Sequence, residues 1–368
     1  MKVAHLCTVD LSLRYLLLAQ IDACIERGDE VLGISAAGPD VAMLEERGMR
    51  HVALASSTRS MDPLADLRAA RELWAVLRRE RPDVLHTHNP KPGIYGRIVG
   101  RLAGVPRVVH TTHGLYATPQ DRFSKRAVVY ALEAVASRFS HVELVQSPED
   151  LELMGRLRLA PGRKLRLLGN GVDLARFRLP APGERDEVRA ELGLAPDDVV
   201  VGLVARLVAE KGVPELLSAV EQLGPPHRLL LVGPHDPEKA DALPESLLER
   251  ARAGGAVLAG HRTDVERLYR AMDVFCLPSH REGFPRAAME AAATGLPVVA
   301  SDIRGCRQVV DDPETGRLFP VRDVDALVAA LRAVLVGGAV DPAVPRSKAE
   351  AEFDESAVVA RVLAAYGS

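Results

Sequence analysis

The sequence predicts an α/β protein with two doubly wound parallel sheets, one in each half of the chain. Short apolar runs alternate with helical patterns, and this alternation runs through the chain twice. Such alternation is typical of parallel sheets covered by helices on both faces. The chain has 368 residues, which exceeds the usual size of one domain. A segment rich in proline, glycine and charge, Phe177–Pro196, separates the two series and includes a short expected helix at Glu184–Leu192.

The first half contains six apolar runs with the length of strands. They are Val3–Val9, Glu30–Ile34, His51–Leu54, Val84–Thr87, Val108–Thr112 and Val142–Gln146. The helical stretches between them are Leu16–Arg27, Asp40–Arg47, Pro63–Glu80, Gly93–Ala103 and Lys125–Ser137. Glycine and proline after two of these helices are expected stop signals, as in Ala103-Gly-Val-Pro106.

The second half repeats the pattern. The expected strands are Val199–Val204, Arg228–Val232, Val257–Leu258, Val274–Leu277 and Pro297–Ala300. The expected helices are Pro214–Leu223, Ser246–Ala253, Val265–Ala271, Arg286–Thr294 and Val324–Val336. We therefore expect an N-terminal domain at residues 1–172 and a C-terminal domain at residues 173–352, facing a shared cleft. A last amphipathic helix, at about residues 353–368, is a candidate to pack back on the first domain.

Composition is that of an ordinary globular protein. No window has the roughly 20 apolar residues of a membrane span, and the N-terminal residues lack the pattern of a signal peptide. The expected location is therefore the cytoplasm. The cysteines are scattered without a Cys-x-x-Cys pair, so neither a zinc site nor a disulfide framework is expected.

Charge is distributed unevenly along the chain. Residues 1–172 carry 24 basic and 19 acidic side chains, and residues 173–368 carry 23 and 31. A basic first half suits a phospholipid surface or a diphosphate-linked acceptor, although solvated surface explains the difference equally well. Six residues carry this argument: Arg97, Arg101, Arg107, Arg122, Lys125 and Arg126. Peripheral contact with the inner membrane face is therefore left open, and no nucleic-acid partner is expected.

The stretch Glu282-Gly-Phe-Pro-Arg-Ala-Ala-Met-Glu290 is the most informative motif. It follows an apolar run and leads into small residues, which predicts a strand, a loop and a helix start. Gly283 permits close approach of a ligand to the backbone, and a helix N-terminus suits a phosphate. Glu282 and Glu290 could then reach hydroxyl groups of that ligand. The alternative is a helix with one capping and one solvated glutamate.

Other polar residues follow expected strands, where open parallel sheets bind ligands. His113-Gly114 ends one strand, and Arg206 and Lys211 follow another with charges that suit a diphosphate. A turn histidine and solvated cations are the alternatives. His86 and His88 share one face of a strand, but spacing places no third ligand, so no metal site is expected.

Together these motifs resemble the retaining glycosyltransferases of family 4, which have two Rossmann-like domains (the GT-B fold). The resemblance spans nearly the whole chain. It rests on His113-Gly114, Asn170-Gly-Val-Asp173, Gly202-x-x-Ala205-Arg206-x4-Lys211-Gly212, Gly260-His-Arg262 and Glu282-Gly-Phe-Pro-x4-Glu290-Ala. Thr8–Arg14 and Ala300–Cys306 look like the bacterial polysaccharide and lipid-linked-oligosaccharide enzymes of that family.

The resemblance implies a role for each matching residue. It assigns the donor diphosphate to Arg206 and Lys211, donor-sugar hydroxyls to Glu282, and ribose hydroxyls to Glu290. His113 would lie at the reaction centre, so the implied catalytic residues are His113, Arg206, Lys211 and Glu282. Further donor contacts are implied for Ser12, Gly233, His261, Arg262, Gly283, Phe284 and the neighbours of Pro285. Weaker acceptor contacts are implied for Arg14, His88, Lys91 and Tyr116. The first loop, Asp10–Arg14, lacks the glycine pair common in the family.

The implied reaction moves a hexose or N-acetylhexosamine from a nucleotide-sugar, expected to be a UDP-sugar, to a hydroxyl of a glycan or lipid-linked acceptor. The expected mechanism is front-face transfer, with no metal or other cofactor required because side chains supply positive charge. A soluble natural-product acceptor and a UDP-sugar epimerase-like enzyme are the alternatives. A dehydrogenase would need Gly-x-Gly-x-x-Gly after a first strand, which neither half has. A catalytically inactive sugar-nucleotide sensor is less favoured, because the charged residues of the motifs are retained.

Overall fold

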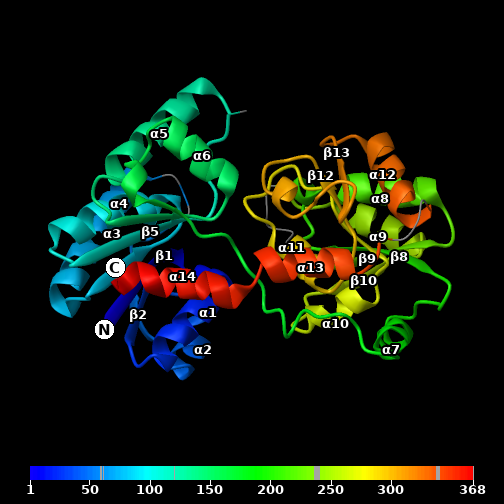
Figure 1. The fold of residues 1–368 in the computed structure, drawn as a ribbon, viewed down its shortest axis with the longest axis horizontal. Helices are drawn as coiled ribbons and strands as arrows, with labels where there is room; N and C mark the ends of the chain where they lie inside the picture. The colour runs from blue at the N-terminus through cyan, green and yellow to red at the C-terminus, as the bar shows by residue number, and fades with distance from the viewer. Residues whose placement is uncertain (59, 61, 120, 236–240, 337–339, 368) are drawn as a thin grey trace. The chain divides into compact units, whose positions relative to one another are not determined.

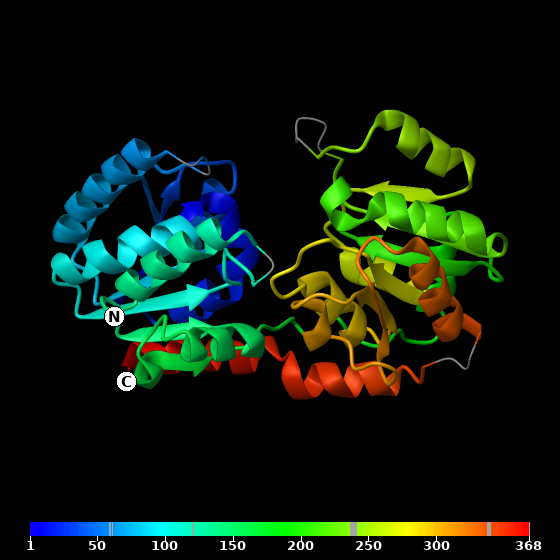
Figure 2. The same cartoon turned by 90° about the horizontal axis from the view of Figure 1, so that it is seen from above.

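The protein divides into two compact units, Met1–Gly169 with Ser356–Ser368, and Asn170–Glu355 (Figure 1). The computed structural model describes the chain except residues 59, 61, 120, 236–240, 337–339 and 368. Each unit contains one parallel sheet with helices on both faces (Figures 1 and 2). The predicted α/β class with two parallel sheets is therefore confirmed.

The first unit has a seven-stranded sheet in the order β3-β2-β1-β4-β5-β6-β7. Its strands are β1 Lys2–Val9, β2 Glu30–Ala36, β3 Arg50–Ala53, β4 Val84–Thr87, β5 Arg107–Thr112, β6 Val142–Val145 and β7 Leu165–Leu167. Its helices are α1 Asp10–Glu26, α2 Val41–Glu46, α3 Pro63–Glu80, α4 Pro90–Leu102, α5 Phe123–Ala136, α6 Pro148–Arg156 and the C-terminal α14 Glu355–Gly367. The central strands are buried, which explains their near-continuous apolar runs.

Two apolar clusters cover the two faces of this sheet. Helices α1, α2 and α14 contribute Leu13, Leu44 and Val362 to one cluster. Helices α3 and α4 contribute Leu73 and Val99 to the other. Figure 1 shows the helices of the two faces, with α14 beside α1.

The second unit has a six-stranded sheet in the order β10-β9-β8-β11-β12-β13. Its strands are β8 Val199–Val204, β9 His227–Val232, β10 Val257–Gly260, β11 Val274–Leu277, β12 Val298–Ser301 and β13 Gly316–Phe319. Its helices are α7 Glu184–Glu191, α8 Val213–Leu223, α9 Glu245–Ala253, α10 Val265–Arg270, α11 Arg286–Ala293, α12 Val324–Val336 and α13 Ala343–Glu352. A short 3-10 helix, Ala209–Lys211, precedes α8.

The start of α1 corrects the sequence-based interpretation. We expected a loop at Asp10–Arg14 and a helix from Leu16, but the helix begins at Asp10, directly after β1. Leu11 and Leu16 are exposed while Leu13 is buried, so apolar residues lie on both faces and obscure the helical period. The Asp10 carboxylate accepts a hydrogen bond from the Asp40 N–H at 2.8 Å, which fixes the first turn.

Four elements were missed by the sequence analysis: α6, β7, β13 and α13. Strand β7 has only three residues, two of them exposed, so it has no apolar run to detect. Strand β13 is the edge strand beside β12 and includes an arginine. Short edge strands carry weak sequence patterns because packing covers them on fewer sides.

Helix α14 is held to the first sheet by a buried hydrogen bond. The Tyr366 hydroxyl lies 2.7 Å from His86 Nδ1, and both side chains are buried. Tyr366→Phe should destabilise the protein by about 1–3 kcal/mol, because it leaves the buried imidazole nitrogen without this partner. Urea unfolding measures the change. Tyr15→Phe is the matched control, since Tyr15 is exposed; equal stability of the two variants would contradict the account.

Candidate functional site

The loop between β11 and α11 carries the first predicted carboxylate, Glu282. Pro285 is the N-cap residue of α11, and no side chain caps that helix start. Gly305 packs against this loop, where a Cβ atom would lie 2.7 Å from the Gly283 carbonyl oxygen. The loop therefore combines an uncapped helix N-terminus with a backbone closely approached by a neighbouring loop, features that suit an anion.

Lys211 and Glu282 form an ion pair, with Lys211 Nζ 2.6 Å from Glu282 Oε1. The two residues come from loops after β8 and β11, which are neighbouring strands. Gly212 brings the loops together: it has φ +70°, and a Cβ atom there would lie 2.1 Å from the Pro278 carbonyl oxygen. A side chain at position 212 would push the loops apart and separate the ion pair.

Arg206 differs from Lys211 in its surroundings. Its side chain is exposed, and no carboxylate among the described residues pairs with it. It follows β8, the strand that also leads to Lys211. Within the described part of the segment after β8, Lys211 is thus paired with a carboxylate and Arg206 is not.

Glu290 lies on α11 and is held by two neighbours. The Tyr269 hydroxyl donates to Glu290 Oε2 at 2.9 Å, and Arg286 Nε lies 3.4 Å from Oε1. Burial raises the pKa of Glu290 above its usual value despite both contacts. Tyr269 itself is fully buried. It was missed by the sequence analysis, because a tyrosine within an amphipathic helix has no local signal of this contact.

Further residues that the sequence analysis expects to contact the donor lie in the second unit. Gly233 follows β9 with φ +141°, and a Cβ atom there would meet the Ala205 carbonyl oxygen at 1.8 Å. His261, after β10, is exposed. Arg262 donates to Asp264 and to Glu191, so its guanidinium is already engaged. Phe284 is half-buried and packs against the main apolar cluster of this unit.

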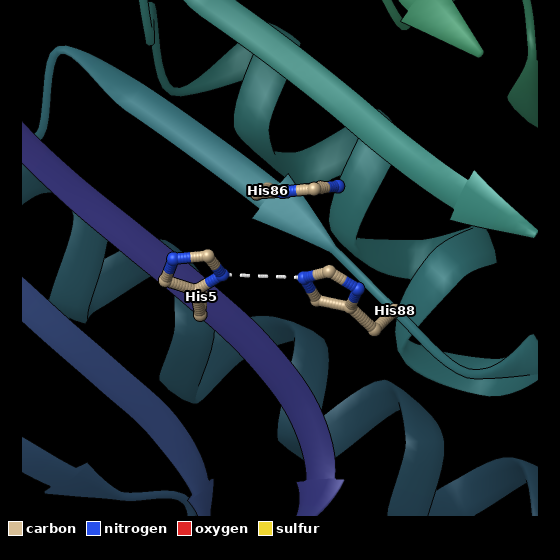
Figure 3. A group of neighbouring side chains, drawn as sticks. All are labelled: His5, His86 and His88. Atoms are coloured by element: carbon tan, nitrogen blue, oxygen red, sulfur yellow. Dashed lines mark hydrogen bonds between the residues drawn. The ribbon is translucent and has the colours of Figure 1, made fainter. Parts of the chain in front are cut away.

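The first unit places His113 at the end of β5, where it joins a group of buried histidines. His113 Nε2 lies 3.1 Å from His88 Nδ1, and His88 Nε2 lies 3.3 Å from His5 Nδ1. Figure 3 shows the facing rings of His5 and His88, with His86 beside them. His5 pairs with His86 in the register of β1 and β4. The sequence analysis missed His5, because only this pairing brings it to the other two.

Sequence spacing placed no third ligand beside His86 and His88, but the structure brings His5 to them. One ring nitrogen from each of His5, His86 and His88 lies within 4.8 Å of the other two. Burial lowers the pKa of His5 to about 4 and the pKa of His88 well below its usual value. Burial also lowers the pKa of His113 to about 4, although that side chain is partly exposed. All these rings are therefore neutral at physiological pH.

A pocket of about 320 Å³ in the first unit brings together three predicted residues, Ser12, Lys91 and Tyr116. Apolar side chains of α5, including Val128 and Leu132, line its other wall. Lys91 Nζ donates to two backbone carbonyls and pairs with Asp66, so its ammonium group is anchored. Arg14 and His88 lie outside the lining. Arg14 pairs with Asp40, and His88 belongs to the histidine group.

Arg97 corrects the basic surface expected for the first half. It is fully buried, with ion pairs to Glu133 at 2.6 Å and Glu143 at 3.0 Å. Arg107 is also partly buried, and its Nε donates to the Ala365 carbonyl. Neither can belong to an exposed basic patch, whereas Arg122 is exposed.

Comparison with known proteins decides the class. Residues 16–176 match the family model Glycosyltransferase Family 4, and residues 184–346 match Glycosyl transferases group 1. The chain is 33% identical over 279 residues to the Escherichia coli UDP-Gal:alpha-D-GlcNAc-diphosphoundecaprenol alpha-1,3-galactosyltransferase, covering 74% of this chain and 71% of that protein. The chain belongs to glycosyltransferase family 4. The predicted transferase class is thereby confirmed.

Two further relatives cover almost the whole chain. A Campylobacter jejuni N,N'-diacetylbacillosaminyl-diphospho-undecaprenol alpha-1,3-N-acetylgalactosaminyltransferase is 24% identical over 100% of this chain and 98% of its own length. The crystal structure of Anabaena Alr3699/HepE in complex with UDP-glucose is similar with a TM-score of 0.80, 21% identity and 99% coverage of both chains. This family 4 chain therefore has the predicted GT-B fold class. Within the described residues, no helix is long and apolar enough to cross a membrane.

The raised pKa of Glu290 predicts a pH-dependent effect on stability. The pKa of Glu290 is higher in the folded state than in the unfolded state, where it is about 4.3. As pH rises above that unfolded pKa, ionisation of the carboxyl group therefore lowers the free energy of unfolding. Glu290→Gln should therefore stabilise the protein against heat at pH 7. The gain should be smaller near pH 4, where wild-type Glu290 is largely protonated.

Thermal unfolding of wild type and Glu290→Gln at both pH values measures this effect. Glu249→Gln is the control, because Glu249 is exposed on α9. A Glu290→Gln variant that is less stable than wild type at pH 7 would contradict a net unfavourable burial of the charge.

Proposed function

We propose that this protein is a retaining glycosyltransferase that moves a hexose or N-acetylhexosamine from a UDP-sugar to a hydroxyl group of a glycan or lipid-linked acceptor. The observation that carries the proposal is the Lys211–Glu282 ion pair, together with the exposed Arg206 in the segment between β8 and Lys211. The second unit, about residues 173–352, binds the donor. The first unit, about residues 1–172, binds the acceptor.

The charges of the second unit suit a nucleoside diphosphate-sugar. Arg206 offers a fork of donors and Lys211 a point charge to the diphosphate. Once a phosphate oxygen replaces Glu282 beside Lys211, the Glu282 carboxylate is free to accept hydrogen bonds from sugar hydroxyls. The UDP-Gal in the name of the Escherichia coli relative and the UDP-glucose in the HepE complex support a UDP-sugar.

Glu290 is assigned to the ribose hydroxyls. It is a carboxylate about one turn inside α11, oriented by Tyr269, and two vicinal hydroxyls suit a carboxylate acceptor. Backbone amides near Gly283 and Phe284 face the sugar and phosphates. His261, which is exposed after β10, is assigned to the base. Arg262 contributes less directly, because its guanidinium is bound to Asp264.

The proposed reaction breaks the bond between the anomeric carbon and the oxygen of the β-phosphate. The acceptor hydroxyl oxygen attacks the same face of the anomeric carbon, so the configuration is retained. Its proton passes to the departing phosphate oxygen, and UDP leaves. Arg206, Lys211 and the start of α11 stabilise the charge that develops on the β-phosphate. Because these groups supply positive charge, the proposal requires no metal ion.

Lys211→Ala and Glu282→Ala should each reduce kcat on the order of 10²- to 10³-fold, because each removes a preorganised contact to the donor. Transfer from UDP-sugars is measured with a screen of acceptors, using release of UDP as the readout. Arg250→Ala is the control, since Arg250 forms an exposed pair with Glu221. Wild-type turnover in both site variants would refute the site assignment.

A lipid-linked acceptor is supported by relatives named for diphosphoundecaprenol-linked substrates. The surface of α5 is compatible with a bilayer, because Phe123, Val128 and Val135 are 76%, 60% and 55% exposed. The exposed Arg122 adjoins this apolar face. Leu132 belongs both to the exposed face and to the wall of the pocket that Ser12 and Tyr116 line. We infer peripheral contact of α5 with the inner membrane face, beside the acceptor pocket.

Val135→Asp and Arg122→Glu should each weaken binding to vesicles that contain anionic lipid, through loss of apolar insertion and of charge attraction respectively. Co-flotation with phosphatidylglycerol vesicles measures this binding. Val336→Asp is the control, because Val336 is a valine on α12 that is even more exposed than Val135. Unchanged flotation of both α5 variants would contradict the membrane contact and favour a soluble acceptor.

A further inference from the structure

Three histidines form one continuous hydrogen-bonded series that ends at His113. His5 Nδ1 lies 3.3 Å from His88 Nε2, and His88 Nδ1 lies 3.1 Å from His113 Nε2. His5 and His88 are fully buried, whereas His113 is partly exposed. The series therefore runs from the interior of the first sheet to its ligand-binding edge. We call His5, His88 and His113 the histidine chain.

His86 lies beside the histidine chain but is not a member of it. Its Nδ1 lies 2.7 Å from the Tyr366 hydroxyl, and its Nε2 lies 2.7 Å from Thr111 Oγ1. Both nitrogens are therefore occupied. The His86 ring packs on His88, with 4.0 Å between ring centroids. A metal ion shared by His5, His86 and His88 would have to displace one of these contacts. The observed arrangement thus favours hydrogen bonding over metal ligation.

Proton positions along the histidine chain are coupled. A neutral imidazole has one N–H donor and one acceptor nitrogen, so His88 must donate on one side and accept on the other. His5 Nε2 is buried and has no hydrogen-bond partner among the described residues. We assign the lone pair to it, because a buried N–H without a partner is rarer than an unpartnered acceptor. His113 Nε2 then accepts from His88 Nδ1, and His88 Nε2 accepts from His5 Nδ1.

This direction makes all three rings the Nδ1–H tautomer. It leaves His5 Nε2 as a buried lone pair, and that atom has no hydrogen-bond partner among the described residues. The chain has no outlet at His5, so it cannot pass protons between the site and solvent. The histidine chain instead fixes ring positions. His88 fixes the tautomer and ring orientation of His113, and His5 fixes those of His88.

We propose that His5 and His88 are positioning residues that hold His113 in a single tautomer and orientation at the reaction centre. This inference rests on the proposed role of His113 in glycosyl transfer. The ring environment supports it, because the groups facing His88 are His5 from β1, His86 from β4, and His110 and His113 from β5 and its following loop. All are imidazoles, and burial lowers the pKa of each. A second proton on His88 or His113 would turn its acceptor nitrogen into a donor and break the series.

The direct test is long-range ¹H–¹⁵N correlation NMR of protein labelled with ¹⁵N-histidine, at neutral pH. His5, His88 and His113 should each be neutral and protonated at Nδ1, whereas free histidine prefers Nε2. Assignment uses the single variants His5→Leu and His88→Gln. In His5→Leu, the tautomer of His113 should change or become mixed although residue 5 does not touch it. An Nε2–H His113 in the wild-type protein, or an unchanged His113 tautomer in His5→Leu, would overturn the proposal, whatever the transferase assay shows.

Kinetics supply the functional test. His5→Leu should reduce kcat on the order of 10²-fold, as expected when a reacting geometry is lost, with the KM for the UDP-sugar little changed. His86→Gln is the control, because it removes a buried histidine of the same group that lies outside the histidine chain. Thermal unfolding of both variants separates folding defects from positioning. Equal losses of kcat in His5→Leu and His86→Gln at equal stability would overturn the positioning role.

Titration with Zn²⁺ or Co²⁺ tests the competing arrangement. If both nitrogens of His88 form hydrogen bonds within the histidine chain, the protein should bind neither ion stoichiometrically. Stoichiometric binding that is lost in His5→Leu and His86→Gln would overturn the histidine chain in favour of a metal site.

Discussion

Close contact between Gly212 and the Pro278 carbonyl is the constraint on which the donor-side geometry depends. A Cβ atom at position 212 would lie 2.1 Å from that oxygen, so only glycine fits. The contact joins the loops that follow β8 and β11, and it thereby sets Lys211 against Glu282. Two opposite charges held this way neutralise each other until an anion competes for the lysine. A diphosphate with attached sugar hydroxyls satisfies both partners at once, whereas a simple anion satisfies only Lys211.

The side chains at the strand ends of the two units differ in charge. The second unit places charged side chains after its strands: Arg206 has no carboxylate partner among the described residues, whereas Lys211 and Arg262 are paired. The first unit instead places His113 after β5, and burial lowers the pKa of this ring to about 4, so it is neutral at pH 7. Neutral donors and acceptors suit an acceptor hydroxyl, while charged groups suit a diphosphate. This difference supports the proposal that the first unit binds the acceptor and the second unit binds the donor.

Much of the fold could be predicted because buried parallel strands have simple apolar sequences. Strands β4 and β11 were predicted with their observed bounds, Val84–Thr87 and Val274–Leu277. The start of α1 could not be predicted, because Leu11 and Leu16 place apolar side chains on the exposed face. The family resemblance assigned Lys211 and Glu282 to one donor, and the two side chains form an ion pair. It could not reveal His5 or Tyr269, whose partners are set by strand register and helix packing, or the complete burial of Arg97.

The central claim is that the donor diphosphate replaces Glu282 as the ionic partner of Lys211 when the donor binds. The most direct measurement is calorimetric binding of UDP to wild type and to Glu282→Gln, together with transfer from the UDP-sugar. Glu282→Gln removes a negative charge that competes for Lys211, so UDP should bind more tightly while sugar transfer falls. Weaker UDP binding by Glu282→Gln, in a variant that unfolds at the wild-type temperature, would contradict the exchange.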